Sequence, residues 1–174
     1  MGTTISFIPQ NSGGGTGSVT TLFNLSTFTS ITSTTSNTLT GSVLIPANTL
    51  NTSTQYVAEL TARALKNGTA GITTLRVYIN TTSSLSGATL LATGGTSTSA
   101  DIFQQVSRVL LIPSYTGIVD PTAAIYSDDS RFTITETKVN SIDWTIDQYV
   151  ILAVQNASTA DSTIGSAIVF KIFS

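Results

Sequence analysis

Apolar and polar residues alternate along most of the chain after residue 40, and alternation of this kind predicts β-strands. In the clearest example, Leu75, Val77 and Ile79 alternate with Arg76 and Tyr78, which gives one buried face and one wetter face. Segments with the same period predict further strands, and one of them is apolar at most positions, as expected for a central strand. These segments are 106–112, 131–135, 149–154 and 167–172.

Residues 56–66 contain good helix formers and are the one region where a helix competes with a strand. The dipeptide Asn67-Gly68 follows directly and separates two apolar runs. Because both residue types tolerate positive φ, this dipeptide is a strong hairpin signal. We therefore expect 56–66 to be a strand that pairs with a strand over 72–80.

About eight strands follow residue 40, at a spacing near the 8–12 residues typical of sandwiches and barrels. The predicted fold class is all-β: an antiparallel β-sandwich, similar to a jelly roll, in which Greek-key connections link two facing sheets. The sequence has no internal repeat that would indicate a solenoid or propeller.

Residues 1–40 differ from the rest because they are rich in glycine, serine and threonine, with the run Gly13–Gly17 at their centre. This composition is that of a flexible linker, so we expect 1–40 to be an extended attachment arm and 41–174 to be the sandwich domain. Short apolar islands in the arm are candidate partner-binding anchors: Ile5, Phe7, Ile8, Phe23 and Phe28. The alternative is that these islands are ordinary strands of the same domain.

Charged residues make up only 9% of the chain, against about 25% in an average domain. The seven basic residues are scattered singly. Nucleic acid and polybasic membrane contacts both need clustered Lys and Arg, so neither is expected. No apolar run is long enough for a transmembrane helix.

Candidate chemistry is sparse, since the chain has no histidine and no cysteine. Asp143 and Asp147 flank Trp144 and suggest a glycosidase pair, but in a strand they would lie roughly 13 Å apart. A turn cap before a strand over 149–155 is the favoured interpretation. Asp128-Asp129 indicates a turn, with a calcium site as the alternative. We predict no catalytic residue, no metal site and no cofactor, and therefore no enzyme.

Three aromatic residues support a different hypothesis, in which the protein binds a receptor or glycan. Aromatic rings offer flat apolar platforms with a polar edge, which suits sugars. The candidate ligand-facing residues are Tyr115, Tyr126 and Trp144.

Several segments resemble one family type: Gly41–Leu50 (GSVLIPANTL), Lys66–Gly68, Ile142–Asp147 (IDWTID), Val154–Ala157 and Asp161. They are similar to small jelly-roll virion proteins of tailed bacteriophages, which include head decoration (cement) proteins and fibre proteins. The resemblance covers about residues 41–174 and implies no catalytic residues. It implies homotrimers that attach through an N-terminal arm.

The function predicted on these grounds is that of a structural protein on the virion exterior. We expect a capsid decoration protein that binds the major capsid protein or another virion protein through its arm and stabilises the head. The alternative is a tail- or head-fibre module that binds a host receptor. On the decoration hypothesis, removal of residues 1–30 leaves a folded domain that no longer binds its particle.

Overall fold

The computed structural model describes residues 19–50, 56–97, 102–114, 117–120, 124–126, 132–134 and 138–173. Every regular element in these ranges is a β-strand. Their bounds are β1 Val19–Asn24, β2 Ser30–Thr32, β3 Thr38–Ile45, β4 Tyr56–Asn67, β5 Thr73–Asn80, β6 Thr89–Ser97, β7 Ile102–Ser114, β8 Gly117–Asp120, β9 Ala124–Tyr126, β10 Phe132–Ile134, β11 Lys138–Ser141, β12 Gln148–Gln155 and β13 Ser162–Phe173.

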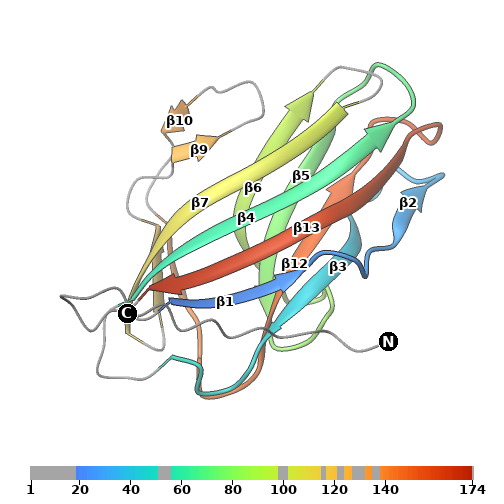
Figure 1. Ribbon diagram of the computed structural model, residues 1–174. Coiled ribbons are helices and arrows are strands. Elements are labelled where there is room, and N and C mark those ends of the chain that lie inside the picture. Colours follow the sequence, from blue (N-terminus) through green and yellow to red (C-terminus); the bar gives the residue numbers. More distant parts are fainter. Residues whose placement is uncertain are drawn as a thin grey trace.

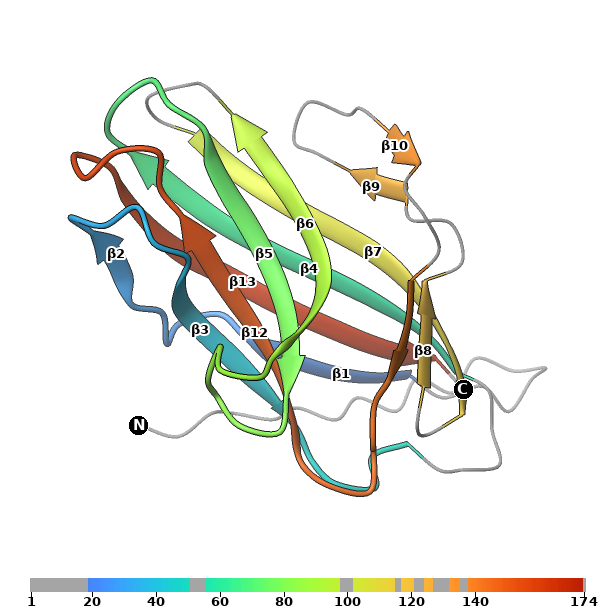
Figure 2. The same ribbon diagram turned by 180° about the vertical axis from the view of Figure 1, so that it is seen from behind.

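The strands form two sheets that face each other (Figures 1 and 2). Sheet A has the order β1-β13-β4-β7-β8-β11, with β2 paired to β13 and the small β9–β10 pair attached to β7. Sheet B has the order β3-β12-β5-β6. All the strand pairs are antiparallel, so the prediction of an antiparallel β-sandwich is confirmed.

Eight long strands are nested as a jelly roll. The first pairs with the last (β1 with β13), β3 pairs with β12, β4 with β7, and β5 with β6. This nesting arises when one long antiparallel ribbon wraps around a core. Strands β8 to β11 are an insertion between β7 and β12, and β8 and β11 widen sheet A.

The alternation seen in the sequence places the core between the sheets. In β4, Ala58, Leu60 and Ala62 point inward and are fully buried. Facing residues from both sheets complete a single apolar cluster, which includes Leu75, Val77, Ile79, Val150, Leu152, Val154, Ile168, Phe170 and Ile172. The predicted inward faces of these segments are confirmed.

The predicted arm of residues 1–40 overlaps the sandwich, because its described residues, 19–40, belong to the domain. Residues 19–24 pair with the C-terminal strand over six positions, and Leu22 belongs to the core. The ring of Phe28 lies against the backbones of Gly41 and Gly165, where an added Cβ would collide with it. Within 19–40, therefore, the islands belong to the domain, because their apolar side chains complete its edge. Ile5, Phe7 and Ile8 lie outside the described residues.

The prediction that 56–66 pairs with 72–80 is wrong, although both segments are strands. β4 pairs with β13 and β7, whereas β5 pairs with β12 and β6. Five residues, 68–72, connect β4 to β5. This connection spans the distance of about 10 Å between packed sheets, whereas a two-residue hairpin turn would keep both strands in one sheet.

Candidate functional site: the outer face of sheet A

The face of sheet A that points away from the core is unusually apolar. Eight large hydrophobic residues are exposed in the described part of the chain, and five of them lie on this one face. These five are Val57, Leu65, Phe103, Val109 and Ile164. An antiparallel sheet with one solvated face normally carries polar residues there, so this face departs from the usual pattern.

Three of the five form a continuous line across neighbouring strands, which we call the apolar row. Ile164 of β13 lies opposite Leu65 of β4, and Leu65 lies opposite Phe103 of β7. Their exposed fractions are 37%, 48% and 45%, respectively. Residues directly opposite in antiparallel strands have Cβ atoms about 5 Å apart, so the three side chains make one patch.

Charged side chains of both signs lie on the same face as the apolar row, and one of them is next to it. The Arg63 guanidinium lies 5.7 Å from the centre of the Phe103 ring, and its Nε donates to Gln105 Oε1 at 2.9 Å. Further along the strands, Glu59 and Lys171 are opposite each other in register. No ion pair joins them within the described residues, where the single salt bridge is elsewhere. Both signs are thus available to a partner.

Sheet B, whose strands β3, β12, β5 and β6 are labelled in Figure 2, has a different outer face. Ile151 and Ala153 alternate with core residues and so point outward, yet both are fully buried. In the neighbouring strand β5, Tyr78 lies opposite Ile151 and Arg76 lies opposite Ala153. Arg76 Nη1 donates to Gln155 Oε1 at 2.8 Å and to Asn37 Oδ1 at 3.3 Å. Asn37 Nδ2 in turn donates to the Tyr78 hydroxyl at 2.9 Å.

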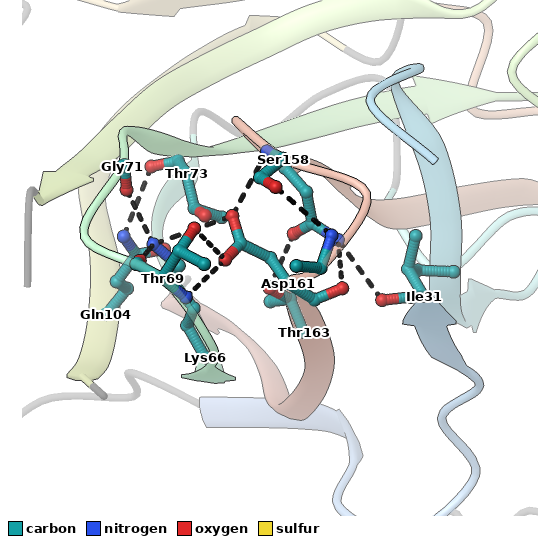
Figure 3. Close-up of polar contacts among 11 residues, drawn as sticks. Ile31, Lys66, Thr69, Gly71, Thr73, Gln104, Ser158, Asp161 and Thr163 are labelled. Carbon is teal, nitrogen blue, oxygen red and sulfur yellow. Dashed lines mark hydrogen bonds and ion pairs between the residues drawn. The ribbon is translucent and has the colours of Figure 1, made fainter. Parts of the chain in front are cut away.

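A buried polar network lies on the core side of the strands that carry the apolar row. Figure 3 shows the contacts within this network. Each row residue has a polar neighbour in its own strand that points inward: Thr163 beside Ile164, Lys66 beside Leu65, and Gln104 beside Phe103. The Lys66 ammonium lies 3.7 Å from Asp161 Oδ2, and both side chains are completely shielded from solvent. Lys66 Nζ also donates to the carbonyls of Thr69, at 2.8 Å, and Gly71, at 2.5 Å.

The Asp161 carboxylate is held from several sides. Its Oδ1 accepts from the Thr69 backbone N–H at 2.7 Å and from the Thr69 hydroxyl at 2.8 Å. Its Oδ2 accepts from the Ser158 N–H at 3.2 Å. Burial alone raises the pKa of Asp161, but the Thr69 bonds, the Lys66 charge and the Ser158 bond outweigh it. The net pKa of Asp161 therefore lies below its ordinary value, and the carboxyl stays ionised at neutral pH.

The network continues to neighbouring strands and loops through amide side chains. Asn156 Nδ2 donates to the Ile31 carbonyl of β2 at 3.2 Å, and Asn156 Oδ1 accepts from the Thr163 hydroxyl at 2.6 Å. Gln104 Nε2 donates to the Thr73 carbonyl at 3.1 Å. The network thus fixes the ends of the strands that carry the apolar row. We interpret this network as structural, because its two charged groups, Lys66 and Asp161, pair with each other.

Two of the sequence-predicted site residues change roles in the structure. Trp144 is only 2% exposed and packs in the core, so it is not a ligand platform. Phe28 packs against the core and is not an exposed anchor. Phe23 is half-buried in the edge strand β1. Tyr126 lies in β9 and its side chain is outside the described part, as are Tyr115 and the pair Asp128-Asp129.

The interpretation of Asp143 and Asp147 as turn caps is confirmed. Asp143 Oδ1 accepts from the Thr145 N–H at 2.9 Å and the Thr145 hydroxyl at 2.6 Å. These bonds lower the pKa of the Asp143 carboxyl. Asp147 Oδ1 accepts from the Ala47 N–H at 2.8 Å and ties this turn to the end of β3. Both aspartates precede β12, as expected.

The described residues hold no group of three or more metal-ligating side chains. The same part of the chain has no helix with the length and hydrophobicity needed to cross a membrane.

No known protein-family model matches the sequence, and no curated protein matches it. Two solved structures are distantly similar. One is the CBM2 module of the evolved Dit of Lactobacillus casei BL23 phage J-1, with 11% identity and a TM-score of 0.36, over 95% of this chain and 81% of that one. The other is the infectious bursal disease virus Gx strain, with 11% identity and a TM-score of 0.27, over 95% of this chain and 45% of that one. Scores this low carry no argument about function.

Sequence reasoning missed the apolar row, although a signal for it exists. In β4, Leu65 shares its two-residue phase with Glu59 and Arg63, and those charged residues mark the solvent side. A leucine in that phase is therefore exposed. The same logic marks Lys66, which shares the inward phase of Leu60 and must find a buried partner.

Proposed function

We propose that this chain is a non-enzymatic structural protein of a virus particle, a decoration protein that binds the assembled bacteriophage head and stabilises it. The observation that carries the proposal is the outer face of sheet A, where five large hydrophobic residues remain exposed on rigid, paired strands. Apolar patches of this kind mark interaction surfaces. The resemblance of residues 41–174 to jelly-roll virion proteins supports a virus particle as the assembly.

Attachment in this proposal uses the N-terminal segment, now limited to residues 1–18 because β1 begins at Val19. Eighteen residues span at most about 60 Å, enough to reach across a neighbouring subunit. The expected partners are the major capsid protein and further copies of this chain in a homotrimer. Binding only the assembled shell stabilises that shell by mass action, and repetition over many sites adds avidity.

Two truncations test the arm. Deletion of residues 1–18 should leave the thermal unfolding of the domain unchanged and abolish sedimentation with purified heads. Deletion of residues 1–30 should also lower thermal stability, because it removes Leu22 from the core and uncovers the edge of β13. If the 1–18 deletion still sediments with heads at parental stoichiometry, attachment through the arm is wrong.

Gold-conjugated antibody on intact particles locates the protein. Labels spread over the head support a decoration protein on the head exterior. Labels confined to the tail or to one vertex would replace this proposal with the fibre or spike module, which binds a host receptor or glycan.

A further inference from the structure

We propose that a series of polar side chains on the outer face of sheet A, next to the Phe103 ring, binds an acidic glycan. This series, called here the polar ladder, consists of Arg63, Gln105, Ser107 and Thr61. The inference concerns the isolated chain and a soluble ligand, so it goes beyond the proposed binding to the head. Three observations carry it: the hydrogen bonds within the ladder, the charge of Arg63, and the paired backbone of the strands that hold it.

The polar ladder is a continuous series of contacts that starts at Phe103. The Arg63 guanidinium lies 5.7 Å from the centre of the Phe103 ring, and its Nε donates to Gln105 Oε1 at 2.9 Å. Gln105 Nε2 donates to Ser107 Oγ at 3.1 Å, and Ser107 Oγ lies 3.3 Å from Thr61 Oγ1 with a hydrogen bond between them. These bonds hold the side chains in one arrangement before a ligand arrives, which lowers the entropy cost of binding.

Arg63 is an exposed cation with no acidic residue opposite it. Its partners in register are Ala167 of β13 and Gln105 of β7, and the single salt bridge within the described residues joins Lys66 to Asp161. The bond to Gln105 uses Nε, so the two terminal nitrogens of Arg63 can bind the two oxygens of a carboxylate side by side. The ligand that complements this charge is therefore a carboxylate.

The strand at the centre of this site has no free edge. β4 pairs with β13 on one side and with β7 on the other, over nearly its whole length. An acidic peptide therefore cannot bind here by adding a strand, because the backbone groups of β4 already bond to its neighbours. A ligand of this face has to be recognised by side chains.

The side chains of the ladder and the Phe103 ring suit a sugar. The ring is 45% exposed and offers a flat apolar surface, on which the C–H groups of a sugar ring can pack. The ladder adds amide and hydroxyl groups, which can bond to sugar hydroxyls. From Phe103 to Ser107 it extends about 13 Å along β7, a length that a short oligosaccharide can follow. Together with the carboxylate that complements Arg63, these features select an oligosaccharide of uronic acids.

Isothermal titration calorimetry of the full-length chain with oligogalacturonate tests the inference. The methyl ester of the same oligosaccharide is the matched ligand, because it keeps the sugar rings and lacks the charge. Oligogalacturonate should bind at least about tenfold more tightly than the ester. Arg63→Gln should abolish this preference, since it removes the cation and keeps a polar amide. Lys171→Gln is the matched control: it removes an exposed cation from the same face, outside the ladder, and should change affinity less than about twofold.

A second variant tests the sugar part of the inference independently of charge. Phe103→Ala should weaken the acid and the ester alike, about tenfold, because both pack on the ring. Polyglutamate, which carries carboxylates without sugar rings, should not compete with oligogalacturonate. Circular dichroism checks that each variant is folded.

Three results would overturn the inference: no saturable binding of oligogalacturonate by the parent chain, equal losses in Arg63→Gln and Lys171→Gln, or competition by polyglutamate. The last result would identify the ligand as an acidic peptide. Sedimentation with purified heads is measured separately on the same variants, so failure of glycan binding and failure of head binding are distinguishable.

Discussion

The outer faces of the two sheets differ in how far their apolar side chains are exposed. Each sheet places apolar side chains on its outward side, but Ile151 and Ala153 of sheet B are fully buried, with Tyr78 and Arg76 opposite them in register. Sheet A leaves the row of Ile164, Leu65 and Phe103 exposed. In a chain with only 9% charged residues, one outer face therefore has its apolar side chains covered and the other has them exposed.

A second feature of sheet A is the buried ion pair on the core side of the apolar row. Below the apolar row, the Lys66–Asp161 pair and its hydrogen bonds hold three strand ends in place (Figure 3). Buried ion pairs contribute little net stability compared with apolar residues, but removing one partner is costly. We therefore interpret this pair as a contact that holds in place the strand ends carrying the row. Loss of either charge should strongly destabilise the fold.

The largest expected effect comes from breaking that pair. Lys66→Met leaves the Asp161 carboxylate buried without its cation and should lower the free energy of unfolding by about 3–5 kcal/mol. Urea titration followed by tryptophan fluorescence measures the change. Lys171→Met, which removes an exposed lysine from the same sheet, should change stability by less than about 0.5 kcal/mol. Equal losses in the two variants would show that the buried pair has no special role.

Acid should weaken the same support without a mutation. The pKa of Asp161 in the folded protein lies below the ordinary value of 3.8, so its ionised form stabilises the fold at neutral pH. This contribution is complete above the ordinary pKa and is lost as pH falls through the folded pKa. We expect the melting temperature to fall below about pH 4. Asp161→Asn should flatten that decline, whereas Asp143→Asn, on an exposed turn, should leave most of it.

Periodicity predicted the fold well because strands bury every second residue, and residues such as Phe170 and Leu60 obey that rule. Periodicity failed where the decision depended on contacts far along the chain. Asn67-Gly68 looks like a hairpin turn, yet Gly68 lies against Asp161, where an added Cβ would come within 2.5 Å of Oδ1. No local pattern shows that a residue 93 positions later occupies that space.

The site was harder to predict than the fold. Glycine and serine near the N-terminus suggested that all of 1–40 is an arm, but pairing of β1 with β13 cannot be seen in composition. Trp144 was predicted as a ligand platform because aromatic rings offer flat apolar surfaces with a polar edge, yet it fills the core. The apolar row was detectable only from the phase that Leu65 shares with Arg63.

A third prediction concerns the edge where the two sheets meet. Phe28 lies against Gly41 of β3 and Gly165 of β13, so its ring joins an edge of sheet B to sheet A. Gly165→Ala would drive a methyl group into this ring and should cost about 1–3 kcal/mol of stability. Thermal denaturation measures the loss. In the double variant Gly165→Ala with Phe28→Ala, the loss should be smaller than the sum of the single losses, and strict additivity would contradict the contact.

The smallest effect tests the contrast between the two faces most directly. Arg76→Ala removes the side chain that bridges Gln155 and Asn37 and should expose Ala153, which lies opposite Arg76 in register. The expected loss of stability is about 1 kcal/mol, from lost packing and hydrogen bonds. Binding of a fluorescent apolar dye should rise, because sheet B then resembles sheet A. Arg63→Ala is the matched control, since Arg63 borders a row that is already exposed. If both variants leave dye binding unchanged, the arginine on sheet B is not what keeps that face covered.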